Sequence, residues 1–163
     1  MRSQITISCE FDGYQFPFSA DNDWQTNNWV YLKLIVMKGN ERFSNTFAAM
    51  DTHEIIRMYQ WFRCISEGRI PKWTKLGFIE PNISLHLQGC QDNVLWTKLH
   101  LSHEFTPDFP SGNPDPDDWF VHITLDLRDI SEILSYLSST MKRYPLRGKK
   151  PPQLLGQRRA PIR

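Results

Sequence analysis

A change in the spacing of apolar residues near residue 51 constrains the fold of this chain more than any other feature. Residues 29–38 form an apolar run rich in β-branched side chains, and residues 41–49 can return beside them after a Gly-Asn turn, which predicts a β-hairpin. From Asp51, which has capping-box spacing to Glu54, the apolar side chains recur at helical spacing. We therefore expect a strand that leads directly into an amphipathic helix, which ends at Gly68.

The second half of the chain repeats this order of elements. Strands are expected within residues 76–88, 93–105 and 118–127, where apolar and β-branched side chains are frequent. A second amphipathic helix is expected to open with a capping box at Asp129 and to stop at Pro145. The repeated order leaves open an origin by internal duplication.

The connections between the expected strands determine the fold class. Residues 5–11 add a half-buried strand before the hairpin, and most links are too short for the crossover that parallel strands need. The sequence thus predicts an α+β fold, with two amphipathic helices packed on one face of a mostly antiparallel sheet. We expect residues 1–145 to form a single domain and residues 146–163 to form a flexible basic tail.

Charge is divided unevenly between these two parts. Residues 142–163 carry eight basic residues and no acidic one, whereas residues 1–141 carry 18 acidic and 11 basic residues, a net charge of −7. An acidic body is a poor ligand for nucleic acid and is suited to a basic protein partner. The tail has few aromatic residues on which bases could stack, so any nucleic-acid binding through it should be weak.

The cysteines and the N-terminal segment favour a reducing compartment. Cys9, Cys64 and Cys90 are odd in number and widely spaced, so neither a disulfide framework nor a zinc ligand set is expected. The first residues lack the apolar core of a signal peptide, and no apolar run is long enough to span a bilayer. We therefore expect a cytoplasmic protein without membrane contact.

The common catalytic signatures are missing from the sequence. It contains no G-x-S-x-G elbow, P-loop, G-x-G-x-x-G or H-E-x-x-H motif, and we expect neither enzymatic activity nor a cofactor. One alternative stays open, because strand alternation places His86, His100 and His122 on the polar sides of three strands. There they could bind zinc or exchange protons, or simply belong to a solvated sheet face.

Acidic residues interleaved with aromatic ones mark the candidate binding site. Charge and expected exposure predict that two segments contact a basic partner. The candidate residues of the first segment are Glu104, Asp108, Asp115, Asp117 and Asp118, and those of the second are Asp21, Asp23 and Trp24. Aromatic residues of the first segment, such as Phe109 and Trp119, would supply the stable contact. Aspartates that form turns explain part of the same pattern.

Several landmarks together resemble the WapI family of bacterial immunity proteins. In chain order they are residues 13–17 (GYQFP), residues 28–33 (NWVYLK), Glu54 and Trp61 in the first helix, residues 80–84 (EPNIS), and the strand from Trp119 into the helix that ends at Tyr144-Pro145. The likeness covers about residues 5–146 and leaves out most of the basic tail. Residues 50–52 (MDT) depart from the more apolar lead-in that such proteins often have.

The resemblance implies a cytosolic protein that binds and neutralises a toxin domain delivered by a neighbouring bacterium, as in contact-dependent inhibition. Toxins of such systems are typically nucleases at the C-terminus of large surface proteins, so the partner is expected to be basic. The family supplies no toxin-contacting residues to transfer, and an alternative adaptor role would rest on nucleic-acid binding by the tail.

Overall fold

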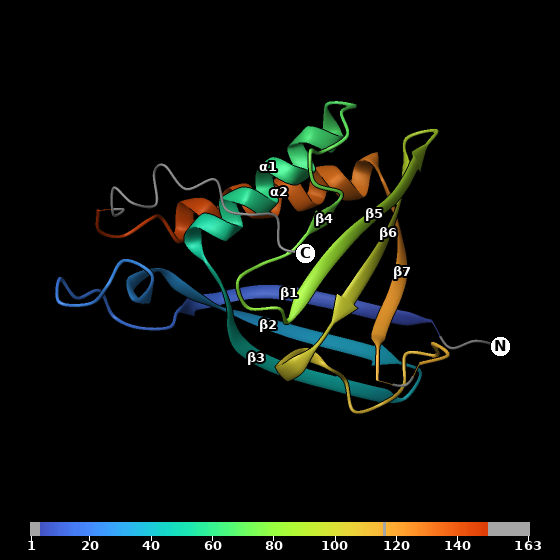
Figure 1. Ribbon diagram of the computed structural model, residues 1–163, viewed down its shortest axis with the longest axis horizontal. Helices are drawn as coiled ribbons and strands as arrows, with labels where there is room; N and C mark the ends of the chain where they lie inside the picture. Colours follow the sequence, from blue (N-terminus) through green and yellow to red (C-terminus); the bar gives the residue numbers. More distant parts are fainter. Residues whose placement is uncertain (1–3, 116, 150–163) are drawn as a thin grey trace.

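The chain forms two antiparallel sheets and two helices, which confirms the predicted α+β class. A computed structural model describes residues 4–115 and 117–149 (Figure 1). The elements in chain order are β1 (Ile5–Tyr14), the 3-10 turn η1 (Thr26–Asn28), β2 (Trp29–Lys38), β3 (Glu41–Asp51), α1 (Thr52–Ser66), β4 (Lys75–Leu76), β5 (Ile83–Gln91), β6 (Val94–Leu101), the 3-10 turn η2 (His103–Phe105), β7 (Trp119–Asp126) and α2 (Leu127–Arg143).

The first sheet has the strand order β1-β2-β3 and contains the predicted hairpin. Alternate residues of β2 face the interior, where Val30, Leu32, Leu34 and Val36 are almost completely buried. The pairing register of β1 with β2 shifts between Phe11 and Tyr14, and that of β2 with β3 shifts between Val30 and Leu32. Such irregularities increase the local twist of a sheet.

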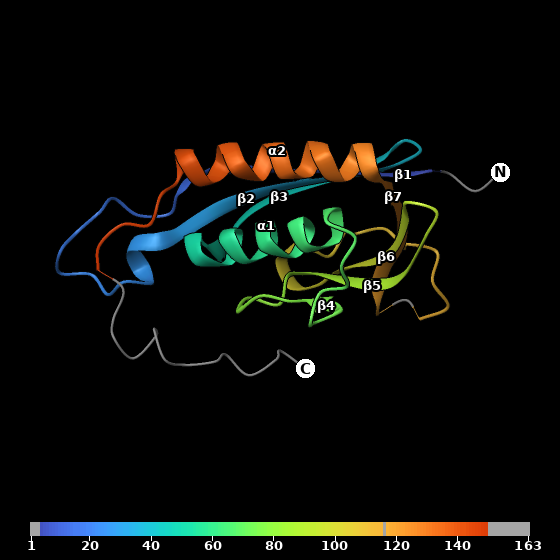
Figure 2. The same ribbon diagram turned by 90° about the horizontal axis from the view of Figure 1, so that it is seen from above.

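The remaining strands form a separate sheet with the order β4-β5-β6-β7, whereas the sequence pattern predicted one sheet. The outer edge of β3 meets η2 instead of another strand, because the Asn45 side-chain amide donates to the carbonyl of Glu104 at 2.7 Å. Figures 1 and 2 show α1 and α2 side by side, with α1 nearer to the second sheet. One core joins all these elements and includes Phe62, Leu99 and Ile130.

Helix α1 begins with the predicted capping box. The side chain of Asp51 accepts from the backbone N–H of Glu54 at 2.9 Å, and the carboxylate of Glu54 accepts from the N–H of Asp51 at 3.1 Å. The other oxygen of Glu54 accepts from the N–H of Ile79 at 2.7 Å. Glu54 is fully buried, so its carboxylate links the start of α1 to the segment that precedes β5.

Helix α2 begins three residues earlier than predicted, and its capping box uses different residues. Asp126 is the N-cap and accepts from the N–H of Asp129 at 2.9 Å, while Asp129 accepts from the N–H of Asp126 at 2.9 Å. The proposed Asp129–Glu132 box was therefore wrong. Glu132 has the same spacing but lies one turn inside the helix, where it pairs with Arg128 at 3.4 Å.

Arg147 belongs to the folded body, although the predicted tail began at residue 146. Its backbone N–H donates to Asn28 Oδ1 and its Nε donates to the carbonyl of Asn27, each at 2.8 Å. Its guanidinium carbon lies 3.6 Å from the centre of the Tyr14 ring, a cation–π contact. Residues 150–163 of the predicted tail lie outside the described residues.

Replacing Glu54 with alanine should lower the free energy of unfolding by about 2–4 kcal/mol, because the buried N–H of Asp51 and the partly buried N–H of Ile79 both lose their carboxylate acceptor. Urea denaturation followed by circular dichroism measures this loss. Asp129→Ala is the matched control, since it removes the same capping-box position from a solvent-exposed helix start and should cost only about 1 kcal/mol. Equal losses in the two variants would contradict a linking role for Glu54.

Candidate functional site

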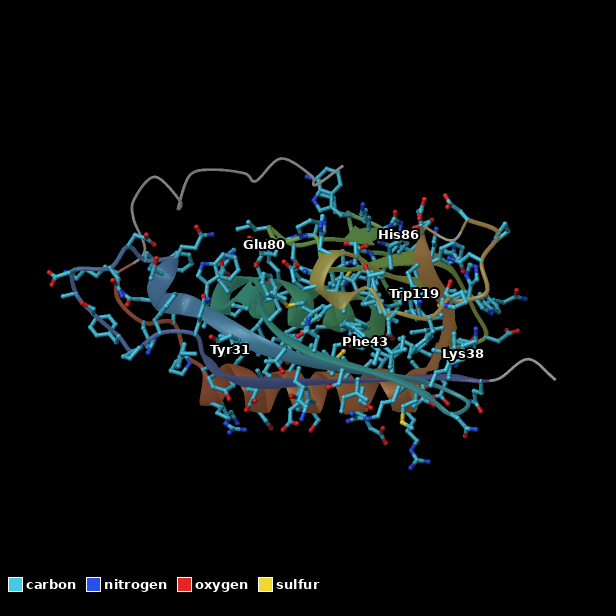
Figure 3. The ribbon with its side chains drawn as sticks, turned by 90° about the horizontal axis from the view of Figure 1, so that it is seen from below. Tyr31, Lys38, Phe43, Glu80, His86 and Trp119 are labelled. Atoms are coloured by element: carbon cyan, nitrogen blue, oxygen red, sulfur yellow. The ribbon has the colours of Figure 1, made fainter. Side chains whose placement is uncertain are left out.

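Residues 104–115 together with Asp117 and Asp118, here called the acidic loop, lie beside the turn between β2 and β3 (Figures 1 and 3). Buried aromatic side chains anchor this loop to the core. The indole N–H of Trp119 donates to the carbonyl of Phe109 at 2.9 Å, and Lys38 Nζ donates to the carbonyl of Pro110 at 2.7 Å. Phe105, Phe109 and Trp119 are all buried. These aromatic residues therefore hold the loop on the core, and their contact with a partner stays a prediction.

The carboxylates of the acidic loop differ in how far they are engaged within the chain. Asp118 pairs with His100, Asp115 accepts from the N–H of Asp117 at 3.0 Å in a turn, and Glu104 accepts from the Asn82 amide at 2.5 Å. A backbone N–H bond within Glu104, followed by the bond from Asn82, lowers the pKa of Glu104. Asp108 and Asp117 are exposed, and their carboxylates have no bonding partner among the described residues.

The second acidic segment lies at the opposite end of the molecule from the acidic loop (Figures 1 and 2). Asp21 is exposed, but the carboxylate of Asp23 accepts from the backbone N–H of Thr26 at 2.7 Å and from the Thr26 hydroxyl at 3.0 Å. This backbone bond is the main cause of the lowered pKa of Asp23. Trp24 is only 7% exposed, so the exposure expected for it was wrong, and its contact with a partner stays a prediction. The eight predicted residues therefore do not form one surface.

The three histidines lie on the outward face of the second sheet. In the strand register Lys98 on β6 is opposite both His86 on β5 and His122 on β7, while His100 is opposite Ser84. Figure 3 shows His86 on the side of this sheet that is turned away from α2. Because Lys98 places a positive charge between His86 and His122, the arrangement opposes a bound cation. Within residues 4–115 and 117–149, no group of three or more His, Cys, Asp or Glu side chains is placed to hold a metal ion.

Positive charge on this face affects the protonation of His86. Burial is the largest cause that lowers the pKa of His86, and Lys75, Lys98 and His100 lower it further. Sequence reasoning singled out the histidines and gave the two lysines no role. The shared face becomes visible only from the pairing of β4 with β5 and of β5 with β6.

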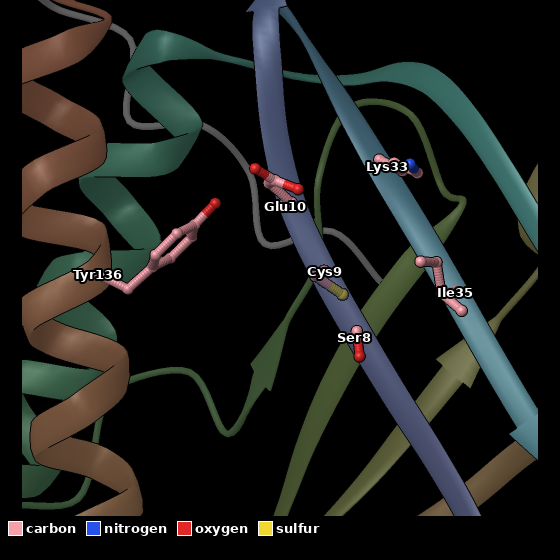
Figure 4. Close-up of a pocket in the computed structure, with 6 residues that line it drawn as sticks. All are labelled: Ser8, Cys9, Glu10, Lys33, Ile35 and Tyr136. Atoms are coloured by element: carbon pink, nitrogen blue, oxygen red, sulfur yellow. The ribbon is translucent and has the colours of Figure 1, made fainter.

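A shallow hollow of about 280 Å³ lies at the edge of β1 and is shown in Figure 4. Ser8, Cys9 and Glu10 from β1, Lys33 and Ile35 from β2, and Tyr136 from α2 line it. The Tyr136 hydroxyl accepts from the N–H of Phe11 at 2.9 Å and so covers part of the free edge of β1. Cys9 is exposed as a residue, but burial around its thiol raises the pKa to about 12, which disfavours a nucleophilic thiolate.

Comparison with known proteins gives one family. The model of the immunity protein WapI-like family matches residues 2–145 of this chain. No curated protein and no solved structure matches the chain. Among the described residues, no helix has the length and apolar character needed to cross a membrane.

Lowering the pH below about 6.5 should destabilise the protein through His86. The pKa of this side chain is lowered from 6.5 in the folded state, so the unfolded chain binds more protons as the pH falls below that value. His86→Gln should therefore flatten the dependence of unfolding free energy on pH between about pH 5 and about pH 7. Lys75→Gln should raise the pKa of His86 in an NMR titration, and an unchanged pKa would contradict the contribution of Lys75.

Proposed function

The chain belongs to the WapI-like immunity protein family, and we propose that it binds and neutralises a cognate toxin domain without performing chemistry of its own. In this proposal the partner is a basic domain, carried at the C-terminus of a larger toxin and active as a nuclease. The encounter takes place in the cytoplasm of the cell that makes the immunity protein.

The observation that carries the proposal is a loop that buried side chains anchor to the core and that presents unengaged carboxylates. The acidic loop is held by Trp119, Phe109 and Lys38, while Asp108 and Asp117 remain exposed. A loop that is already ordered loses little conformational entropy when it binds, so more of the contact energy is retained as affinity. Of the two candidate aspartates at the other end, only Asp21 offers a comparable exposed carboxylate, because Asp23 is engaged with Thr26.

Charge gives this loop a direct way to oppose a nuclease. A nuclease needs basic side chains around its active site to hold phosphate groups. Carboxylates on a fixed loop can approach the same side chains, increase the rate of association, and occupy the place of the substrate. The net charge of −7 on residues 1–141 acts in the same direction.

Co-expression with the toxin domain encoded beside this protein should restore growth of cells that the toxin alone arrests. The purified chain should form a one-to-one complex with an inactive form of that domain, with a Kd on the order of nanomolar. A toxin domain from an unrelated system is the control and should remain toxic. Growth arrest that persists at equal expression, together with no detectable complex, would refute the proposed function.

Reversing the unengaged charges of the acidic loop should slow binding without unfolding the protein. The double variant Asp108→Lys and Asp117→Lys should reduce the association rate constant about tenfold at low ionic strength, with less effect at high salt. Stopped-flow fluorescence measures these rates.

The matched control reverses two exposed carboxylates far from the acidic loop, with the same change in net charge. Asp12→Lys and Asp21→Lys should reduce the association rate constant by less than about threefold, because only the long-range field changes. Equal effects of the two double variants, or a larger effect of the control, would place the interface away from the acidic loop.

A further inference from the structure

The outward face of the second sheet differs in charge from the rest of the acidic body. We call it the cationic face, and its residues are Lys75, Ser84, His86, Gln88, Trp96, Lys98, His100, Phe120, His122 and Thr124. Acidic residues of this face lie only at its two ends, where Asp126, opposite Val94 in the register, caps α2 and Asp118 pairs with His100. Lys75 and Lys98 lie at the centre of the face and form none of the ion pairs of the described residues, so the centre suits a ligand of opposite sign.

The side chains of the cationic face hold one another in place. Lys98 Nζ lies 3.8 Å from the centre of the Phe120 ring, and that ring packs edge-on against His122 at 5.5 Å between ring centres. His122 Nδ1 is 2.9 Å from Gln88 Oε1. These contacts arrange cations and aromatic rings before any partner arrives, which lowers the entropic cost of binding.

Trp96 supplies an exposed aromatic group on the same face. It is 43% exposed and lies against Gly89 on the neighbouring strand, where a Cβ atom would come within 3.3 Å of the indole ring. The absence of a side chain at Gly89 therefore leaves room for the ring across β5. Tryptophan fixed on a sheet, with much of its surface still exposed, is the residue type most enriched at the energetic centres of protein interfaces.

The cationic face is continuous with the acidic loop. The pair between His100 and Asp118 joins them, because His100 belongs to the face and Asp118 ends the loop. The cationic face therefore begins on the His100 side of this pair, and the acidic loop begins on the Asp118 side. A long polyanion such as RNA that lay along the face would meet the carboxylates of the loop at this border, whereas a short acidic protein segment can fit the face alone.

We propose that the cationic face is the second part of the toxin-binding surface and that it binds a segment of the toxin that carries carboxylates beside an apolar side chain. This inference rests on the proposed function and adds the chemistry of the partner. The acidic loop contacts the basic region of the toxin, the cationic face contacts an acidic segment next to that region, and Trp96 packs on the apolar side chain.

Binding of the inactive cognate toxin domain to variants of the full chain tests this inference. Lys98→Glu should weaken Kd at least 30-fold and Trp96→Ala at least tenfold in isothermal titration calorimetry. Lys142→Glu is the matched control, because it makes the same charge change at an exposed site on α2 and should alter Kd less than threefold. Thermal melts establish that each variant is folded, and Lys98→Gln, which adds no repulsion, should give an intermediate loss if Lys98→Glu does not fold.

The outcomes separate this inference from the proposed function. One outcome would overturn the cationic face alone. In it, the Asp108→Lys and Asp117→Lys variant binds the toxin domain more slowly, whereas Lys98→Glu, Lys98→Gln and Trp96→Ala all leave Kd unchanged. No binding by the wild-type chain would overturn both. A labelled single-stranded oligonucleotide that binds the free protein and is released by Lys98→Glu, while toxin binding is unchanged, would assign the face to nucleic acid and overturn the inference.

Discussion

The buried carboxylate of Glu54 is the interaction on which the arrangement of this fold depends. One oxygen accepts from Asp51 at the end of β3, and the other accepts from Ile79 in the segment that leads to β5. A carboxylate in the interior is tolerated only when strong donors replace water, and here the donors belong to the two halves of the chain. The end of β3 and the segment that leads to β5 are thereby held to the same end of α1.

A buried polar network extends from this point to the last described residues. The hydroxyl of Thr52, the residue after Asp51, donates to Asn28 Oδ1 at 3.1 Å, and the same oxygen accepts from the N–H of Arg147 at 2.8 Å. Asn28 is fully buried and also donates to the carbonyls of Trp24 and Arg147. The long segment between β1 and β2 is therefore fixed by the C-terminal part of the body, which explains why Trp24 and Asp23 serve structure there.

The sequence was informative where a short-range pattern determines the structure. The hairpin of β2 and β3 and the box of Asp51 and Glu54 depend on neighbours in the chain, so spacing alone predicted them. The division into two sheets depends on the edge of β3 meeting η2 through Asn45 and Glu104, which are far apart in sequence. The N-cap of α2 was placed at Asp129 because the spacing allows two capping boxes, Asp126 with Asp129 and Asp129 with Glu132. The first box is the one observed, because β7 ends at Asp126.

The candidate surfaces show the same limit of sequence reasoning. Acidic residues could be located as a cluster along the chain, but burial of Phe109 and Trp119 and engagement of Asp118 depend on tertiary contacts. Lys98 was not selected because a lone lysine on a strand is ordinary. Its significance comes from its place between His86 and His122 in the register.

Two adjoining surfaces of opposite charge can determine the orientation of a bound partner as well as its affinity. A single acidic patch attracts any basic protein and leaves its rotation about the contact weakly defined. With the acidic loop on one side of the His100–Asp118 pair and the cationic face on the other, a partner rotated by half a turn would bring like charges together. That repulsion disfavours wrong orientations and wrong partners, which is how charged interfaces obtain specificity. Under the proposed function, such a border would help an inhibitor to distinguish its own toxin from related basic domains, because basic charge is common to nucleases and the position of a neighbouring acidic segment is not.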